Sequence, residues 1–439
     1  MDKYVILGCG WAGITFAIEL KRNFPTLEVI VLEKSNTPGG LLNSVKINNH
    51  FFDIGGSHVI FSHNKSTLQK LLAVLGKNSV SHQRNTKVLL NSIFVPYPLE
   101  NGLYVLSPEE RAEALICFLE VLTSRAIDWT PKTFKDWIYG FFGKWIAEKY
   151  LIPYNEKIWK RPLDAIDVDW IYTPGRLPIP DWRDVVKSAA GIPTVGYVEQ
   201  SLFYYPKCGG IQALFDSAAK EAKKIGVKIV NNVEVSKIKR TKNEWIINDE
   251  IKARKLASTI PLKELVKALD APKEVMKASE ELDYNKIAIV GIALKKAAPD
   301  QHWIYVPDSS IIFHRYAWIS NYSPKNSPRG ESTILAEITL PPNAKVSTKE
   351  LVDKTVTDLE NLNVLKQKEI LFTKAWLHEY GYPIYKVGHR EKREKIMSWL
   401  REQNVVSVGR WGSWHYWNMD KTYEETIKEI NFLKASKTE

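Results

Sequence analysis

The stretch from Tyr4 to Glu33 constrains the fold of this chain more than any other: YVILGCGWAGITFAIELKRNFPTLEVIVLE. The apolar run Tyr4 to Leu7 is typical of a buried parallel strand. The apolar spacing of Ala12 to Leu20 predicts a helix, and Val29 to Leu32 predicts a second buried strand. A strand, a helix and a strand in this order predict one βαβ unit of a parallel sheet.

Three glycines follow the first strand in the spacing G-x-G-x-x-G. Gly8 permits a tight turn, Gly10 lets the backbone approach a pyrophosphate, and Gly13 lets the helix pack close to the strand. Glu33, 20 residues after Gly13, can accept hydrogen bonds from a ribose diol. This context predicts a dinucleotide site, and a glycine-rich turn in a purely structural βαβ unit is the alternative.

Two further glycine pairs, Gly39-Gly40 and Gly55-Gly56, follow the acidic residue. An NAD enzyme has no need of glycines there. An FAD enzyme does, because the ribityl chain and the isoalloxazine run past the pyrophosphate and lie against backbone without Cβ atoms. Three glycine clusters within the first 60 residues resemble the flavoproteins with two dinucleotide-binding domains, and they predict FAD as the cofactor.

The composition predicts a globular cytoplasmic protein. The chain has 439 residues, of which 44% are hydrophobic and 25% charged. Its longest uncharged apolar stretch, Tyr4 to Ile18, has 15 residues and is too short to span a membrane. No small-residue cleavage site follows this stretch. Cys9, Cys117 and Cys208 lack metal-ligand spacing, so we predict no metal and no disulfide framework.

The net charge of +11 favours a polyanionic partner, such as nucleic acid, a membrane surface or a nucleotide-linked substrate. The lysines are scattered and form no long basic tail, so a solvated basic surface explains the charge equally well. We therefore predict no nucleic-acid partner.

The predicted fold class is α/β. It combines a discontinuous FAD-binding Rossmann-like domain with a helical insert domain and an antiparallel β-sheet substrate domain. The predicted boundaries are 1–78 with 191–270 and 395–439 for the FAD-binding domain, 101–190 for the helical domain, and 79–100 with 271–394 for the sheet domain.

Local patterns predict the elements of these domains. A helix is expected at Lys65 to Leu75, and a second one starts at Thr133 and is broken at Pro153. Lys87 to Pro98 predicts a hairpin with its turn at Asn91-Ser92. Further strands are predicted at Val233 to Ile238, Ile311 to Tyr316 and Ser332 to Leu340.

Seven segments, spread over nearly the whole chain, resemble one family in the same order. They are FDIGGSHVIFSH, VPYPLEN, TPKTFKDW, PYNEKIW, FHRYAWISNYSP, YGYP and VGRWGSWHYWNMD. The family is UDP-galactopyranose mutase, especially its eukaryotic-type branch, within the amine-oxidase-like FAD superfamily. Two positions depart from its pattern: Ser57 separates the glycine from the histidine, and Glu100 stands where the resemblance predicts glutamine.

The resemblance implies a flavin-dependent isomerase that interconverts UDP-galactopyranose and UDP-galactofuranose without net redox change. It implies that FAD is active when reduced, with N5 as the nucleophile on the anomeric carbon. The expected partners are a UDP-sugar substrate and NAD(P)H or another reductant, and a homo-oligomer is compatible with the sequence.

The resemblance also implies the site. Arg176 and Arg315 match the arginines that hold the diphosphate, a task for which paired guanidiniums suit a departing dianion. His58 matches a histidine near the flavin, and we count it with them as catalytic. Without the resemblance, two surface salt-bridge arginines and a core histidine are the plainer interpretations.

The remaining predicted site residues divide into two sets. The substrate-binding set is Tyr97, Asn155, Trp159, Gln200, Tyr305, Tyr382 and Tyr416. The cofactor-binding set is Gly8, Gly10, Gly13, Glu33, Gly39, Gly40, Gly55, Gly56, Arg84, Val235, Gly409, Arg410, Asn418 and Met419.

Other functions remain open at this point. A flavin oxidase or desaturase of the amine-oxidase superfamily shares the glycine pairs and the discontinuous domain, but it does not need arginines placed for a diphosphate. A mutase acting on another UDP-hexose fits the same motifs. The net charge alone suggests a non-catalytic flavin-binding or nucleic-acid-binding protein.

Overall fold

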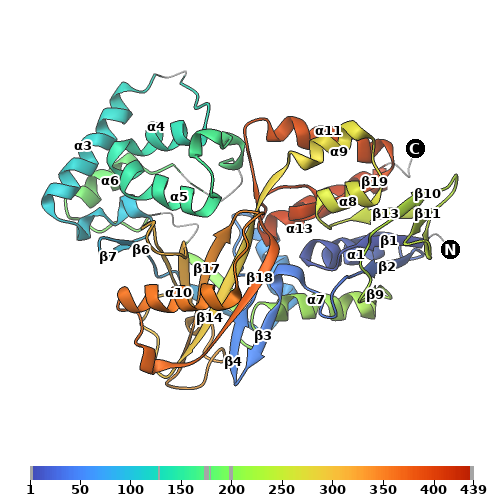
Figure 1. The fold of residues 1–439 in the computed structure, drawn as a ribbon, viewed down its shortest axis with the longest axis horizontal. Helices are drawn as coiled ribbons and strands as arrows, with labels where there is room; N and C mark the ends of the chain where they lie inside the picture. The colour runs from blue at the N-terminus through green and yellow to red at the C-terminus, as the bar shows by residue number, and fades with distance from the viewer. Residues whose placement is uncertain (1–2, 127–128, 173–176, 178, 197–200, 436–439) are drawn as a thin grey trace.

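The computed structural model describes residues 3–126, 129–172, 177, 179–196 and 201–435. Figure 1 shows three regions: a parallel sheet with its helices at the right, a long mixed sheet below the centre, and a group of helices at the upper left. The predicted fold class, an α/β Rossmann-like domain combined with a second sheet and helices, is confirmed.

The parallel sheet has five strands in the order β19-β13-β1-β2-β9, and every neighbouring pair is parallel. Its strands are β1 (Lys3–Leu7), β2 (Glu28–Leu32), β9 (Lys228–Val230), β13 (Lys255–Ser258) and β19 (Val405–Ser407). Helix α1 (Trp11–Asn23) joins β1 to β2, as the apolar pattern predicts.

The side chains of β1 alternate between two cores, because both faces of the sheet are covered. Tyr4 and Ile6 pack into the core beneath α1, where the helices α7 and α13 contact α1. Val5 and Leu7 pack into a second core. The covering helices are α7 (Gln212–Lys224) and α13 (Met419–Ala435) on the first side, and α8 (Leu262–Ala268), α9 (Lys273–Glu280) and α11 (His389–Glu402) on the second.

The mixed sheet has seven strands in the order β18-β14-β17-β16-β15-β6-β7, and β15 and β6 form its parallel pair. Its strands are β6 (Thr86–Leu90), β7 (Ile93–Pro96), β14 (Asp283–Leu294), β15 (Trp303–Tyr305), β16 (Arg315–Trp318), β17 (Ser332–Leu340) and β18 (Ile370–Ile384). Helix α10 (Thr348–Asn361) packs against β18 and β14. In the pairing of β16 with β17, Arg315 lies directly opposite Glu337.

The remaining elements are short or lie at the edges. The helical group consists of α3 (Pro108–Ser124), α4 (Phe134–Ile146), a π-helical turn (Ala147–Leu151), α5 (Ile152–Trp159) and α6 (Trp182–Ala189). Elsewhere lie α2 (Lys65–Leu75), α12 (Gly409–Gly412), β3 (Ser44–Ile47), β4 (His50–Asp53), β5 (Ser79–Gln83), β8 (Leu202–Pro206), β10 (Ile238–Arg240), β11 (Trp245–Ile247) and β12 (Ile251–Ala253).

Three predicted elements are wrong in detail. The helix from Thr133 is interrupted at Gly143, which has a φ of 72°, and Pro153 lies in the first turn of α5, where proline is tolerated. Residues 233–237 form no strand, and β10 begins only at Ile238. Residues 311–314 also lie outside a strand: they follow a turn in which the Asp308 side chain accepts hydrogen bonds from Ser310, and the Ile312 amide donates to the Asp358 side chain (2.7 Å).

Within the described ranges, no helix is both long enough and apolar enough to cross a membrane.

Candidate active site

A cavity of about 860 Å³ lies where the parallel sheet meets the mixed sheet. Gly8, Glu33 and Thr259 reach it directly after β1, β2 and β13, at the carboxyl ends of these parallel strands. Arg315 and Glu337 reach it from β16 and β17 of the mixed sheet. The carboxyl edge of a parallel sheet is where α/β folds bind their ligands, so this cavity is the candidate site.

The glycines of the first turn have different surroundings. Gly8 has a φ of 88°, which other residues rarely adopt, and a Cβ on Gly13 would lie 2.0 Å from the Gly8 carbonyl oxygen. A Cβ on Gly10 would meet no described atom closer than 4.0 Å, and Gly10 lines the cavity at the N-terminus of α1. Packing therefore explains Gly8 and Gly13, whereas Gly10 leaves room for a ligand, as a pyrophosphate at a helix N-terminus requires.

Glu33 lies at the end of β2 and is held by its neighbours. Its Oε2 accepts a hydrogen bond from the Cys9 amide (2.9 Å), and its Oε1 accepts from the amide (2.9 Å) and hydroxyl (2.8 Å) of Ser35. A carboxylate has further lone pairs, so these bonds fix its orientation and leave acceptor capacity for a ribose diol. This geometry fits the predicted role in binding the cofactor.

The second glycine pair faces the first turn. Gly39 forms an isolated parallel bridge with Gly10, and its φ is 133°. Gly40, with a φ of 60°, would place a Cβ 3.4 Å from the Gly10 Cα atom. Gly39 and Gly40 line the cavity, as does Gly55 farther along the chain. Glycines of three loops thus bring backbone to the cavity surface, which suits the flat, extended FAD molecule.

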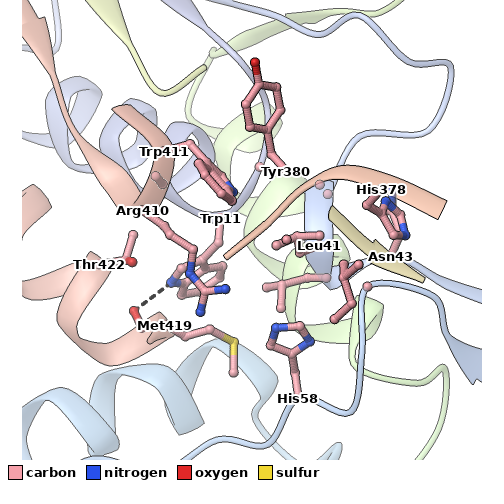
Figure 2. Close-up of a pocket in the computed structure, with 18 of the residues that line it drawn as sticks. Trp11, Leu41, Asn43, His58, His378, Tyr380, Arg410, Trp411, Met419 and Thr422 are labelled. Carbon is pink, nitrogen blue, oxygen red and sulfur yellow. Dashed lines mark hydrogen bonds between the residues drawn. The ribbon is translucent and has the colours of Figure 1, made fainter. Parts of the chain in front are cut away.

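His58 and Arg410 extend toward the same part of the cavity, with Met419 beside them (Figure 2). His58 Nδ1 lies 2.9 Å from the Gly56 carbonyl oxygen, and because a carbonyl only accepts, Nδ1 carries the proton. Burial, followed by the positive charge of Arg410, lowers the pKa of His58 to about 4. His58 is therefore neutral near pH 7, and its Nε2 is an acceptor.

Trp11 and Met419 close one side of this region. The Trp11 Nε1 atom donates a hydrogen bond of 3.0 Å to the Met419 carbonyl oxygen (Figure 2). The predicted cofactor residues Val235 and Asn418 also line the cavity. Val235 lies in the irregular segment 233–237, in which Val233 and Glu234 also line the cavity.

Arg315 forms a buried ion pair with Glu337. The Arg315 Nη2 atom lies 2.8 Å from Glu337 Oε2, and the Glu337 side chain is 1% exposed. Glu337 Oε1 accepts hydrogen bonds from the Ser57 amide (3.0 Å) and hydroxyl (2.9 Å). Burial alone would raise the pKa of Glu337, but the Arg315 charge and these bonds lower it to about 2. Glu337 is therefore an anion at any physiological pH.

All four predicted substrate tyrosines line the same cavity: Tyr97, Tyr305, Tyr382 and Tyr416. They lie as two pairs, with ring centroids 5.1 Å apart for Tyr97 and Tyr305 and 5.2 Å apart for Tyr382 and Tyr416. The Tyr382 hydroxyl is 3.4 Å from Glu337 Oε2. Tyr305 lies opposite Arg315 in the pairing of β15 with β16, so two of these rigid, hydroxyl-bearing rings lie close to the Arg315–Glu337 pair.

Arginines stack on both tyrosine pairs. The Arg84 guanidinium lies 4.3 Å from the ring centroid of Tyr97 and 5.0 Å from that of Trp303, and the Arg410 guanidinium lies 5.0 Å from that of Tyr416. Cation–π contacts of this kind fix the planes of the guanidiniums. Arg84, Arg315 and Arg410 together bring three positive charges to one cavity.

Two predicted substrate residues, Asn155 and Trp159, do not line the cavity, because both face the core from α5. The Asn155 amide donates to the Leu151 carbonyl oxygen one turn earlier (2.7 Å). The Trp159 ring is 3% exposed and packs edge-on behind Tyr382 and Tyr416, with centroids 6.3 and 5.8 Å away. Their positions indicate a supporting role behind the tyrosines.

The other predicted residues fall into two groups. Gly56 and Gly409 have φ values of 108° and 93° and, like Gly13, serve the packing of the chain without lining the cavity. Arg176 and Gln200 lie outside the described residues, so their roles stay predictions from the sequence. Within the described part of the chain, no cluster of His, Cys, Asp and Glu side chains is arranged to hold a metal ion.

Glu337, Ser57 and Trp303 also line the cavity and were not predicted as site residues from the sequence. Glu337 had a signal of its own, since it is the single charged residue in the predicted buried strand STILAEITL. For Ser57 the unexpected position in GGSH was the signal, and the contact with Glu337 now explains it. Nothing in the sequence distinguished Trp303 from the other tryptophans of the chain, which has 15.

Comparisons with known proteins agree with this geometry. Residues 6–75 match a family model described as an NAD(P)-binding Rossmann-like domain. Residues 189–425, more than half of the chain, match a family model described as flavin containing amine oxidoreductase. The first match covers the glycine-rich turn, and the second covers the strands that carry Arg315 and Glu337.

Several solved structures share the fold. The structure of reduced UDP-galactopyranose mutase is similar over 100% of this chain and 97% of that chain, with a TM-score of 0.90 and 23% identity. A protein from Exiguobacterium sp. 255-15, assigned as a protoporphyrinogen oxidase, matches over 99% of both chains with a TM-score of 0.77 and 15% identity. A fatty acid isomerase from P. acnes matches over 98% of both chains, with a TM-score of 0.66 and 16% identity.

Proposed function

The chain belongs to the flavin-containing amine oxidoreductase family, and from this premise we propose that it is an FAD-dependent isomerase that interconverts UDP-galactopyranose and UDP-galactofuranose. FAD is the cofactor that the family and the glycine-lined wall of the cavity imply. Family membership implies a flavin enzyme. The isomerase activity, the UDP-sugar substrate and the need for reduced FAD are what we propose in addition.

One observation carries the proposal: Arg315 and four tyrosines line the same cavity as the cofactor glycines. A guanidinium that binds oxygen pairs and several hydroxyl donors suit a diphosphate. An oxidase that takes hydride from an apolar substrate has no use for this set. The full-length similarity to the solved mutase and the seven sequence motifs support the same conclusion.

The residues of this chain have separate tasks in the proposed reaction. FAD, held by the glycine-lined loops and Glu33, would supply a nucleophilic N5 for the anomeric carbon of the sugar when bound in its reduced form. Arg315, together with Arg176 from the sequence prediction, holds the diphosphate and stabilises the charge that grows on it as it leaves. The tyrosine hydroxyls donate further hydrogen bonds to the diphosphate, while the tyrosine rings keep water from the sugar.

His58 and Arg410 act on the cofactor side. His58 is neutral near pH 7, because burial and Arg410 lower its pKa to about 4, and its Nε2 can accept a hydrogen bond. Arg410 brings a positive charge to the same part of the cavity and favours an anionic, reduced flavin. The positive charge of Arg410 therefore supports the proposal that the flavin acts in its reduced form.

A second candidate is a flavin oxidase or desaturase, which the description of the matching family model favours. The two functions differ in redox balance. An oxidase converts one substrate for each flavin reduced and then needs an electron acceptor. The isomerase returns its flavin unchanged, so turnover continues after a single reduction and yields no oxidised product.

The arginine assignment is tested by UDP binding. We expect Arg315→Ala to weaken the displacement of a fluorescent UDP probe by about tenfold or more, because a charge-assisted contact is lost. FAD content, measured by absorbance, stays at the wild-type level. Arg240→Ala, which removes an exposed arginine bonded to the Gln403 carbonyl oxygen, is the matched control. Wild-type affinity for UDP in Arg315→Ala would refute the assignment.

A further inference from the structure

Glu337 is a charged group that was not among the site residues predicted from the sequence. It is 1% exposed and lies on β17, the strand next to that of Arg315. Its two oxygens have different partners: Oε1 accepts from the amide and hydroxyl of Ser57, and Oε2 accepts from Arg315 Nη2. A buried carboxylate is costly unless it is paired and hydrogen-bonded, and Glu337 is both.

The pair leaves most of the Arg315 donors for another ligand. A guanidinium has a fork of N–H groups, and Glu337 takes a hydrogen bond from Nη2. The Nε atom is buried and, among the described residues, has no hydrogen-bond partner. Arg315 can therefore bind an anion without releasing Glu337. In that state the carboxylate lies close to the anion as well, and the two repel each other.

We propose that Glu337 is a positioning residue and permanent counter-ion of Arg315, which orients the guanidinium and keeps the affinity for the diphosphate below what the arginine alone would give. This inference rests on the proposed function for the identity of the diphosphate as UDP. Through Ser57 the same carboxylate ties Arg315 to the loop of Gly55 and His58, both of which line the cavity.

Moderate affinity has a reason in the proposed reaction. UDP must leave the anomeric carbon, return to it and finally dissociate with the product. An arginine without a counter-ion in a partly buried site would hold the anion more tightly at every stage, and uniform tightening of this kind brings no gain in rate. Glu337 offsets the charge of Arg315 before the substrate enters. It also holds the Arg315 guanidinium in the orientation that binds the diphosphate.

The test compares Glu337→Gln with the wild-type holoenzyme, using two anions, UDP and inorganic pyrophosphate. Removing the carboxylate charge next to Arg315 should tighten the binding of both anions by about tenfold or more, as expected for a close charge at a partly buried site. The variant alone should be less stable than the wild type, and pyrophosphate should raise its melting temperature by more. FAD content is measured in each sample.

Two variants serve as controls, and a third is a substitute for the test variant. Glu337→Asp keeps the charge, so its affinities should stay within about threefold of the wild type. Glu331→Gln changes the net charge equally at a glutamate that bonds His50 and does not line the cavity, and it should bind as the wild type does. Glu337→Met replaces Glu337→Gln if the amide does not fit beside the Ser57 donors, with the same expected result.

The outcomes distinguish a failure of the role proposed for Glu337 from a failure of the proposed function. Tighter binding of both anions by the neutral variants supports the role of Glu337. Unchanged or weaker pyrophosphate binding overturns it, and lower stability with unchanged binding would indicate a purely structural residue. If UDP binds neither the wild type nor the variants, the proposed function fails, and the pyrophosphate result alone decides the role of Glu337.

Discussion

At the scale of single residues, the glycines of the first turn are required for two different reasons. Gly13 is required by the packing of the chain, and Gly10 by the space that a ligand needs. A Cβ on Gly13 would lie 2.0 Å from the Gly8 carbonyl oxygen, so this glycine is needed for the helix to pack against the strand. Gly10 has a φ of −82°, which any residue adopts, and a Cβ there would make only ordinary contacts, 4.0 Å from the Gly39 carbonyl oxygen and the Gly40 Cα atom. The cavity, rather than the chain, is what requires a glycine at this position.

This difference gives a paired prediction. Gly10→Ala should leave the fold intact and weaken FAD binding by about tenfold, because the methyl group occupies space at the pyrophosphate position. Gly13→Ala should destabilise the protein itself by roughly 1–3 kcal/mol, because the chain must move to admit the methyl group. Flavin absorbance per protein and the melting temperature of the FAD-free protein measure the two effects. Equal FAD affinity in Gly10→Ala and the wild type would contradict the placement of the pyrophosphate.

At the scale of elements, strong local sequence patterns were sufficient to predict the bounds of helices and strands, whereas weak patterns were not. The predicted helix Lys65 to Leu75 and strand Ser332 to Leu340 have the predicted bounds in the structure. The segment Val233 to Ile238 is apolar enough for a strand, but Val233 bonds to the Glu33 carbonyl oxygen and the segment runs past the cavity. Its conformation depends on a distant contact, which propensity cannot reveal.

The hairpin β6–β7 offers a prediction at this scale. Asn91 and Ser92 form its turn with φ values of 47° and 67°, both in the left-handed region. Asparagine tolerates this region, whereas serine is strained in it. Ser92→Gly should therefore raise the free energy of unfolding by about 0.5–1 kcal/mol in urea titrations. Ser66→Gly, at an exposed helical position in α2, should lower it by a similar amount.

An opposite result at the turn, with Ser92→Gly less stable than the wild type, would mean that the serine side chain makes a stabilising contact that outweighs the strain.

At the scale of the whole molecule, the site depends on residues far apart in the sequence. Ser57 and Glu337 are 280 positions apart, yet they share two hydrogen bonds at the cavity. The glycine turn and Glu33 could be predicted because they belong to one local motif. The tyrosines and arginines of the site could be predicted only from the family resemblance. Glu337 was predicted neither from the local motif nor from the resemblance. The division into three domains remains a prediction.

The buried histidines predict how the whole molecule responds to acid. Burial lowers the pKa of His302 to about 4 and of His314 and His389 to about 3, against a usual value of about 6.5. Below about pH 6.5 the unfolded chain binds more protons than the folded one, so stability falls as the pH falls. Burial lowers the pKa of His58 and His415 as well, so these two histidines act in the same direction. Asp53, whose pKa burial raises to about 6, acts in the opposite direction.

We expect the free energy of unfolding to be nearly constant above about pH 7 and to drop by a few kcal/mol between about pH 6.5 and 5.5, at roughly 1.4 kcal/mol per histidine and pH unit. Urea titrations at several pH values measure this change. Equal stability at pH 7 and pH 5.5 would mean that these histidines become protonated without unfolding.

The most direct test of the central claim follows the sugar itself. Purified holoenzyme is incubated with UDP-galactofuranose, once with oxidised FAD and once after reduction by dithionite, and UDP-galactopyranose is measured by chromatography. We predict many turnovers with the reduced enzyme, none with the oxidised enzyme, and no oxidised product in either sample. Absence of UDP-galactopyranose with fully reduced enzyme, or consumption of one substrate for each flavin, would contradict the account.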